Sequence, residues 1–344
     1  MVLPLSASAG SYYSPFQYET IANRPQSHYL WSMIRIIKPP RLRPGDTIGI
    51  CAPASPPGSL SHLESGIRYL ERLGFRVKPG PHIYRTRGYL AGSDAQRASD
   101  LNMMFSDKSV RAIFTVRGGY GSHRILPLLD FRTIRRHPKI LVGYSDITAL
   151  QFAFLARAGL VTFSGPFVVE LGKTLNAEME ERFWRSLMSA RPPAPVREDR
   201  AKRLGRNRGG MHTGRLLSAN LTLLSTLLGT PYVPLLHKPI YLLEDIGERP
   251  YRINRMLQQL KLAGVLDRSG GIAFGSFANC EPERGKPSLS LREIFHDLFD
   301  TFSMPVVSGI HYGHIRNSVS FPIGVRVRLD GTKGTITFLE SGVD

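Results

Sequence analysis

The fold is decided by the stretch Lys139-Ile-Leu-Val-Gly-Tyr-Ser-Asp-Ile-Thr-Ala-Leu150. Its apolar run over residues 140–142 has the composition of a short buried strand. Gly143 permits a sharp turn, and residues 146–156 then follow the pattern of an amphipathic helix. Ser145 is therefore predicted at a strand-turn-helix corner, where the free amides and the dipole of the helix N-terminus favour a developing negative charge.

Two roles fit Ser145 at this corner. The pattern Gly143-Tyr-Ser-Asp-Ile147 lacks the second glycine of the nucleophile elbow Gly-x-Ser-x-Gly, so the motif is incomplete. Serine is also a preferred helix N-cap, and the corner taken alone favours that structural role over a nucleophile. A catalytic role depends on partners elsewhere in the chain.

Strand-like and helical patterns alternate between residue 46 and about residue 170. Apolar strand-like runs cover residues 47–52, 76–79, 110–116, 140–142 and 161–166, and helical patterns cover residues 61–73, 93–105, 124–129 and 146–156. Such alternation predicts right-handed βαβ units and a parallel sheet. Ligands bind beyond the carboxyl ends of the strands in such sheets, and the glycine corners after Val116 and Val142 both lie at such ends.

A second region begins at Gly214, after the Pro-rich segment Arg191-Pro-Pro-Ala-Pro195, which is typical of a linker. Strands are expected over residues 240–244, 271–277, 305–309, 325–329 and 334–339, with a helix over residues 253–262. The predicted fold class is α/β, with a parallel-sheet domain over residues 41–170 and a smaller α+β domain over residues 213–344. Residues 1–40 are expected to form a disordered extension, and residues 171–212 a basic linker.

Composition narrows the class of protein. Among the 344 residues, 42% are hydrophobic, as in ordinary globular proteins. No apolar run approaches the ~20 residues that span a bilayer, and the N-terminus lacks the basic region of a signal peptide. Cys51 and Cys280 match no zinc or disulfide spacing, so both are expected as buried thiols. These features favour a reducing compartment, the cytoplasm.

The formal net charge of +18 raises the question of nucleic-acid binding. Residues 182–208 hold nine Lys/Arg against Glu198 and Asp199, giving 9 − 2 = +7. No helix-turn-helix, zinc finger or aromatic-basic sheet motif accompanies this charge. A solvated loop is favoured over specific nucleic-acid binding, and a non-catalytic protein that binds nucleic acid or an anionic surface stays as the alternative.

A second glycine corner, Arg117-Gly-Gly-Tyr-Gly-Ser122, follows the strand-like run that ends at Val116. It matches neither the dinucleotide fingerprint nor a P-loop. Its amides suit a tight turn that approaches a ligand. Beside Ser145, the amide of Gly118 or Gly119 could form one half of an oxyanion hole, and the amide of Asp146 the other half. Ser122 is the next candidate nucleophile.

Glu244 and His314 complete a possible triad with Ser145. Glu244 ends an apolar strand, and His314 follows another in a glycine-containing loop. Acyl transfer by a serine needs a base within reach of the hydroxyl and a carboxylate that fixes the tautomer of that base. A zinc site at His311 and His314 is not predicted, because no third ligand stands at metalloenzyme spacing.

These residues stand within a series of blocks through which the chain resembles the serine LD-carboxypeptidases (muramoyltetrapeptide carboxypeptidases), a family that includes the microcin C self-immunity peptidases. The similarity runs from about Pro44 to Leu339. The matching blocks occur in family order, and they are Pro44-Gly-Asp-Thr-Ile-Gly-Ile-Cys-Ala-Pro-Ala-Ser55, Tyr89-Leu-Ala-Gly-Ser-Asp94, Arg117-Gly-Gly-Tyr-Gly-Ser122, Gly143-Tyr-Ser-Asp-Ile-Thr-Ala149, Phe163-Ser-Gly-Pro166, Leu228-Gly-Thr-Pro-Tyr232, Leu243-Glu-Asp-Ile-Gly-Glu-Arg-Pro-Tyr-Arg252 and Tyr312-Gly-His314.

The resemblance implies a site between the two domains, with Ser145 as nucleophile, His314 as base and Glu244 orienting it. It implies a homodimer that needs no metal or organic cofactor. The expected reaction removes the terminal D-alanine of a muropeptide tetrapeptide by cutting an L-to-D bond, with Arg117 or Arg124 pairing with the terminal carboxylate. The rival substrate is an aminoacyl-nucleotide conjugate, for which Tyr120, Phe183 and Trp184 are candidate base platforms.

Overall fold

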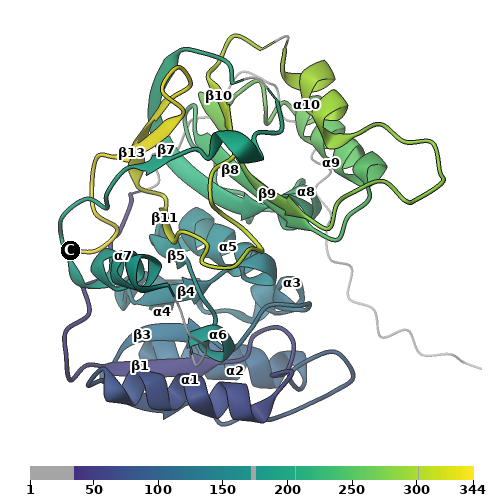
Figure 1. Ribbon diagram of the computed structural model, residues 1–344. Helices are drawn as coiled ribbons and strands as arrows, with labels where there is room; N and C mark the ends of the chain where they lie inside the picture. Colours follow the sequence, from purple (N-terminus) through teal and green to yellow (C-terminus); the bar gives the residue numbers. More distant parts are fainter. Residues whose placement is uncertain (1–34, 172–175, 206, 301) are drawn as a thin grey trace, which may run out of the picture. The chain divides into compact units, whose positions relative to one another are not determined.

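Two β-sheets carry the chain in the computed structural model, which describes residues 35–171, 176–205, 207–300 and 302–344 (Figure 1). The first sheet has the order β11-β5-β4-β3-β1-β2. Neighbours among β1 to β5 pair in parallel, whereas β11 pairs antiparallel to β5. Its strands are β1 (Thr47–Cys51), β2 (Arg76–Pro79), β3 (Val110–Thr115), β4 (Ile140–Gly143), β5 (Thr162–Ser164) and β11 (Phe321–Ile323).

Helices cover both faces of this sheet because side chains alternate along each strand. In β3, Ile113 packs with residues of α2, α4 and α5, whereas its neighbours Ala112 and Phe114 pack with residues of α1, α6 and α7. The predicted parallel α/β fold class is confirmed. The helices are α1 (Leu60–Arg72), α2 (Asp94–Ser106), α3 (Ser122–Ile125), α4 (Phe131–Arg136), α5 (Thr148–Ala158), α6 (Val168–Leu171) and α7 (Ala177–Met188), with short 3-10 turns at Leu126–Leu128 and Ser145–Ile147.

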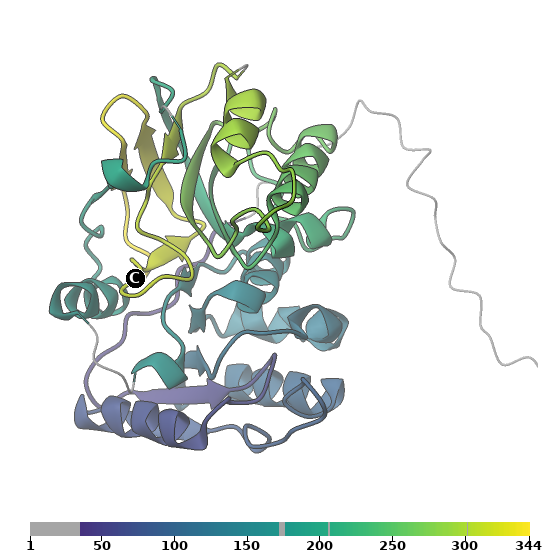
Figure 2. The same ribbon diagram turned by 45° about the vertical axis from the view of Figure 1, so that its right-hand side comes forward.

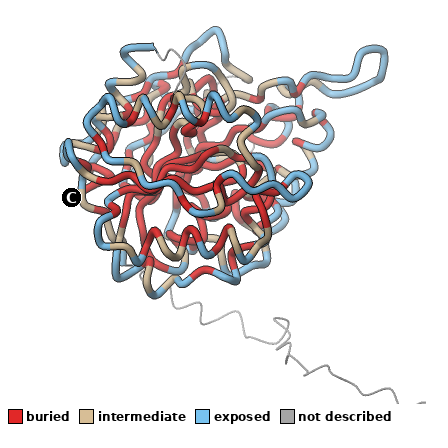
Figure 3. The backbone as a smooth tube through the Cα atoms, turned by 90° about the horizontal axis from the view of Figure 1, so that it is seen from below, coloured by how far each residue is buried: buried red, intermediate tan, exposed pale blue. Residues whose placement is uncertain are grey.

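The second sheet has the order β10-β9-β8-β7-β12-β13-β6. Strands β7 to β10 pair in parallel, and β12, β13 and β6 add antiparallel pairs at the other side. Its strands are β6 (Val196–Arg197), β7 (Met211–Asn220), β8 (Ile240–Ile246), β9 (Gly271–Ala278), β10 (Val306–Ser308), β12 (Arg326–Asp330) and β13 (Thr335–Phe338), and its helices are α8 (Leu221–Leu227), α9 (Pro250–Leu262) and α10 (Leu291–Phe299). Figure 3 shows buried segments, in red, in the interior and exposed segments, in pale blue, around them.

Two segments cross between the halves of the chain. Strand β11 lies in the C-terminal half yet forms the edge of the first sheet, where Figures 1 and 2 show it in yellow among strands of earlier colours. Residues 171–212, for which the sequence predicts a linker, contain α7 and β6. Asn176 caps α7, Phe183 and Leu187 of that helix are buried, and β6 pairs with β13.

Three further predictions concern the N-terminal extension, the cysteines and membrane spans. Of the expected extension, residues 1–34 lie outside the described residues, and Ile37 forms a β-bridge with Leu160. Both Cys51 and Cys280 are buried free thiols, as the sequence predicts. Within the described ranges, none of the helices has the length and apolar character that crossing a membrane requires.

Candidate active site

Ser145 lies two residues after the end of β4, in the 3-10 turn that leads into α5. Its φ of 58° is in the left-handed region, which few residues other than glycine adopt and which is frequent at functional sites. The N-caps of the 3-10 turn and of α5 are Tyr144 and Ile147, and neither helix has a side-chain cap. The N-cap interpretation of Ser145 is therefore wrong, and its hydroxyl is free for another role.

The second glycine corner packs against Ser145. A Cβ atom at Gly118 would stand 3.1 Å from Cβ and 3.3 Å from Oγ of Ser145. Ser55 holds the turn, because its amide donates to the Gly118 carbonyl (3.3 Å) and its hydroxyl accepts from the Tyr120 amide (3.2 Å). Within the described residues, no acceptor binds the amides of Gly118, Gly119 or Asp146. All three amides remain able to donate to an oxyanion.

The Asp146 side chain joins the two corners. It is buried, and its Oδ2 accepts from the Ser122 amide at 2.8 Å. Ser122 itself is fully buried and its hydroxyl has no partner in the described part of the chain. Because a nucleophile must reach substrate, Ser122 is unsuited to the role for which it was the second candidate.

Glu244 and His314 form the hydrogen-bonded pair that the sequence predicts. Glu244 is 1% exposed at the carboxyl end of β8, and its Oε2 lies 2.7 Å from Nδ1 of His314. The same oxygen accepts from the His314 amide at 3.3 Å, while Oε1 accepts from Nδ2 of Asn220 at 3.1 Å. With Nδ1 engaged, Nε2 is the ring nitrogen left to act on a substrate or hydroxyl.

The carboxylates around His314 set its protonation. Burial lowers the pKa of His314, but the hydrogen bond to Glu244 and the charges of Glu244, Asp245 and Glu170 outweigh burial, so its pKa is raised above the ordinary value. Burial raises the pKa of Asp245, and the nearby charge of Glu244 acts in the same direction. The imidazole is thus prepared to accept a proton.

The structure brings the serine corner to the histidine across the two sheets. The ring centroids of Tyr144 and His314 are 5.0 Å apart, and Ser145 follows Tyr144 directly. Two hydrogen bonds link the sheets nearby, one between Ser164 Oγ and Tyr312 Oη (3.0 Å) and one from the Asn220 amide to Thr148 (3.3 Å). A Ser145–His314 hydrogen bond is not formed within the described residues, and such bonds often form only with substrate present.

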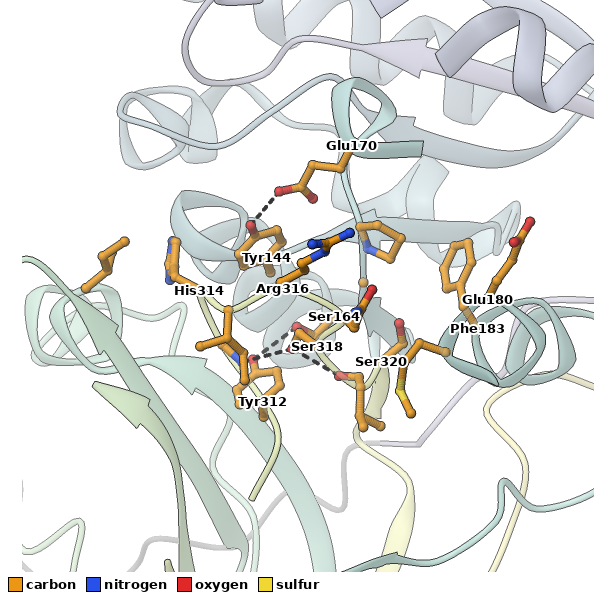
Figure 4. A pocket seen from close by; sticks show the side chains of 18 residues that line it. Tyr144, Ser164, Glu170, Glu180, Phe183, Tyr312, His314, Arg316, Ser318 and Ser320 are labelled. Carbon is orange, nitrogen blue, oxygen red and sulfur yellow. Dashed lines mark hydrogen bonds between the residues drawn. The ribbon is translucent and has the colours of Figure 1, made fainter. Parts of the chain in front are cut away.

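A cavity of about 610 Å³ opens beside His314 (Figure 4). Tyr144 donates to Glu170 (2.8 Å) on one side, and Met179 and Phe183 form part of an apolar wall. The exposed Arg316 also lines the cavity. The volume of the cavity falls within the range of small-molecule binding sites.

The predicted carboxylate partners lie elsewhere. Arg124 donates three hydrogen bonds to Asp94, so its guanidinium is already paired. Arg117 forms no ion pair within the described residues. Its guanidinium lies next to Gly58, however, and it is not among the residues that line the cavity. Arg316 was missed, although it stands only two residues after His314.

The three aromatic residues that the sequence suggested for stacking on a nucleotide base lie in different places. Trp184 packs in the core against Phe75 and Phe114, with ring centroids 5.3 and 6.0 Å away. Tyr120 is exposed and stands edge-on to Tyr89 at 5.3 Å, and Phe183 lines the cavity. Among the residues described, no three His, Cys, Asp or Glu side chains gather in a way that could hold a metal ion.

Two family models together match most of the chain. Residues 48–165 match the LD-carboxypeptidase N-terminal domain, and residues 213–329 match the LD-carboxypeptidase C-terminal domain. A probable murein peptide carboxypeptidase of Bacillus subtilis (strain 168) is 38% identical over 319 residues, which cover 89% of this chain and 95% of the relative.

Two solved structures share the fold. The muramoyltetrapeptide carboxypeptidase of Oxalobacter formigenes has a TM-score of 0.76 at 29% identity, covering 84% of this chain and 97% of its own. The microcin C7 self-immunity protein MccF in its wild-type apo state has a TM-score of 0.79 at 26% identity, covering 90% and 100%. Fold and relatives together define a hydrolase of the carboxypeptidase class, with a two-domain α/β fold. The chain belongs to the LD-carboxypeptidase family.

Proposed function

We propose that this chain is a serine carboxypeptidase that removes the terminal D-alanine from muropeptide tetrapeptides by hydrolysing an L-to-D peptide bond. The observation that carries the proposal is the left-handed corner at Ser145, whose hydroxyl has no partner in the described residues and whose neighbour Tyr144 lies 5.0 Å, between ring centroids, from the His314 that Glu244 binds. The murein peptide carboxypeptidase relatives support the substrate class.

The proposed reaction proceeds through an acyl-enzyme. Ser145 Oγ attacks the scissile carbonyl carbon while Nε2 of His314 takes the hydroxyl proton, and Glu244 stabilises the imidazolium. The amides of Asp146 and of Gly118 or Gly119 hold the oxyanion. When the C–N bond breaks, His314 gives its proton to the leaving amine of D-alanine. Water, deprotonated by His314, then attacks the ester carbonyl carbon. The bond from that carbon to Ser145 Oγ breaks, His314 returns the proton to Oγ, and the shortened peptide leaves with a new carboxylate.

Arg316 is the proposed partner for the terminal carboxylate of the substrate. Among the described residues that line the cavity, Arg316 is the one Lys or Arg. It forms no ion pair with Glu170 or Glu180, the two acids of the lining. Tyr144 donates to Glu170, and Tyr69 donates to Glu180, so hydrogen bonds already engage both acids. A guanidinium left free in this position suits a carboxylate.

Replacement of the nucleophile tests the proposal. Ser145→Ala should lower kcat for release of D-alanine from a muropeptide tetrapeptide by on the order of 10⁴ to 10⁶, with an unchanged thermal melt. The assay follows free alanine by mass spectrometry, and Ser122→Ala serves as the matched control. Comparable turnover by the Ser145→Ala enzyme would sink the assignment.

Arg316→Gln tests the carboxylate contact separately. The variant should raise KM for the tetrapeptide about tenfold or more, because one charge-assisted hydrogen bond contributes about 1.5–3 kcal/mol. With a tetrapeptide whose C-terminus is amidated, wild type and variant should have the same KM. If both substrates respond equally, Arg316 does not bind the carboxylate.

An aminoacyl-nucleotide conjugate is the alternative substrate, favoured by the similarity to MccF and by Phe183 on the cavity wall. The same mass-spectrometric assay with an aminoacyl sulfamoyl nucleoside decides between them through the ratio of kcat/KM values. Cytoplasmic location and a homodimer remain our expectations, and light scattering of the purified chain measures the latter.

A further inference from the structure

A second cavity, of about 730 Å³, is separate from the candidate active site. Its walls come from residues 35–38, from α4, from Arg215 of β7 and from the acids Glu340 and Asp344. The two cavities share none of their described lining residues. The second cavity therefore needs an explanation that the proposed peptidase reaction does not supply.

Its lining is strongly cationic. The side chains carry six positive and two negative charges, giving 6 − 2 = +4. A sphere of this volume is about 11 Å across, close to the Debye length of about 8 Å at physiological salt, so solvent ions screen the charges only in part. The cations are Arg35, Lys38, Arg132, Arg135, Arg136 and Arg215.

The two acids of the lining, Glu340 and Asp344, together balance the charges of Lys38 and Arg215, and Glu340 contacts both cations. It pairs with Lys38 at 3.1 Å and with Arg215 at 3.3 Å, and it accepts from the Arg326 amide at 2.7 Å. The other four guanidiniums, those of Arg35 and of the three α4 arginines, form no ion pair within the described residues. The net positive charge is thus concentrated on these four.

The α4 arginines share one side of their helix. Arg132 stands three residues before Arg135 and four before Arg136, and like charges at these spacings repel. Ile134, between them, is fully buried. Arg132 also lies in the first turn, where the helix dipole favours acids. Solvation explains three exposed arginines, but it does not explain why Arg35 joins them around one cavity.

The cavity is preformed by backbone pairing. The Ile37 amide donates to Gly159 (2.8 Å), and the Ile37 carbonyl accepts from Val161 (2.9 Å). These residues precede β5, and α4 precedes β4. The cavity therefore lies toward the amino ends of β4 and β5, whereas Ser145 follows the carboxyl end of β4.

We propose that this cavity binds a small phosphate-rich anion, a compound with two or more linked phosphoryl groups. Guanidinium forks bind phosphate oxygens in pairs, and a ligand with three or four negative charges matches the +4 lining. Aromatic side chains are missing from the described lining, so a nucleobase would gain no stacking. Recognition therefore runs through the phosphates and is independent of any nucleoside attached to them.

Calorimetry of the purified full chain with inorganic tripolyphosphate, at constant ionic strength, tests the proposal. The Arg132→Gln, Arg135→Gln, Arg136→Gln triple variant should raise Kd at least tenfold. The control triple variant Arg191→Gln, Arg197→Gln, Arg200→Gln loses the same charge from exposed positions outside the cavity and should stay within about threefold of wild type. ATP and GTP should bind alike.

Each other outcome contradicts the proposal. If both triple variants weaken binding equally, the effect is net charge and no site exists. If sulfate binds as well as tripolyphosphate, the cavity does not select linked phosphates. A folding defect is distinguished by the ligand-free melt. Loss of like-charge repulsion on α4 offsets the loss of Arg135 and Arg136 from its last turn, where the helix dipole favours cations, so the cavity variant should melt close to wild type. A much lower melting temperature would show that these arginines are structural.

Discussion

At the scale of single residues, the surroundings of His314 predict how the activity depends on pH. A general base must be neutral, so kcat/KM should fall as pH drops through its pKa. That pKa is raised by Glu244 against the opposing effect of burial. The decline should therefore begin above pH 6.5, the ordinary value for histidine.

Glu244→Gln separates charge from position. Glutamine can keep the hydrogen bond, but burial then dominates and the pKa of His314 should fall, shifting the acid limb of the kcat/KM profile to lower pH. Loss of the charge that stabilises the imidazolium should lower kcat more than it raises KM. The measurement is a pH–rate profile from pH 5 to 8 for both enzymes. A fully active variant with an unshifted profile would remove Glu244 from the mechanism.

At the scale of elements, the turn after β3 and the corner after β4 depend on each other. Gly118→Ala would place a methyl carbon 3.1 Å from Ser145 Cβ and from the Phe167 ring, closer than ordinary packing. We expect kcat to fall at least about tenfold, equivalent to about 1.4 kcal/mol, because the serine must shift from its corner.

The comparison variant is Gly74→Ala: Gly74, unlike Gly118, has a positive φ, and the new methyl group meets open space. It should cost stability through backbone strain and leave kcat unchanged. Kinetics and thermal melts of both variants make the comparison. Equal kcat for wild type and Gly118→Ala would show that contact with this turn does not position Ser145.

At the scale of the whole molecule, β11 joins the two halves of the chain. It pairs with β5 through Phe321, Pro322 and Ile323, and both Phe321 and Ile323 are fully buried. A fragment ending at residue 170 lacks this strand and leaves the β5 edge open, so it should be insoluble or unfolded. Residues 35–344 should unfold in one transition by circular dichroism and fluorescence. Two separate transitions, or a cooperatively folded fragment, would contradict this view.

Much of the first sheet and of the site follows from local patterns. The expected strand over residues 110–116 is β3, and the glycine corner with Ser145 is where the sequence predicts it. The helix α7 and the strand β6 were not anticipated, because the prolines at 192, 193 and 195 and the arginines around them suggest a linker, although residues 177–188 have a short amphipathic pattern. Arg316 was overlooked for a different reason: only the cavity distinguishes it from other surface arginines.

Local sequence patterns are enough to predict the strand that precedes Ser145, the strand that carries Glu244, the loop of His314 and the burial of both cysteines. Apolar periodicity and turn chemistry act over a few residues, so they can be read locally. Three features depend on tertiary packing: β11 completes the first sheet, Asp94 forms an ion pair with Arg124, and four arginines that form no ion pair within the described residues line one cavity. Those contacts join residues far apart in the chain, and packing of the whole fold selects them.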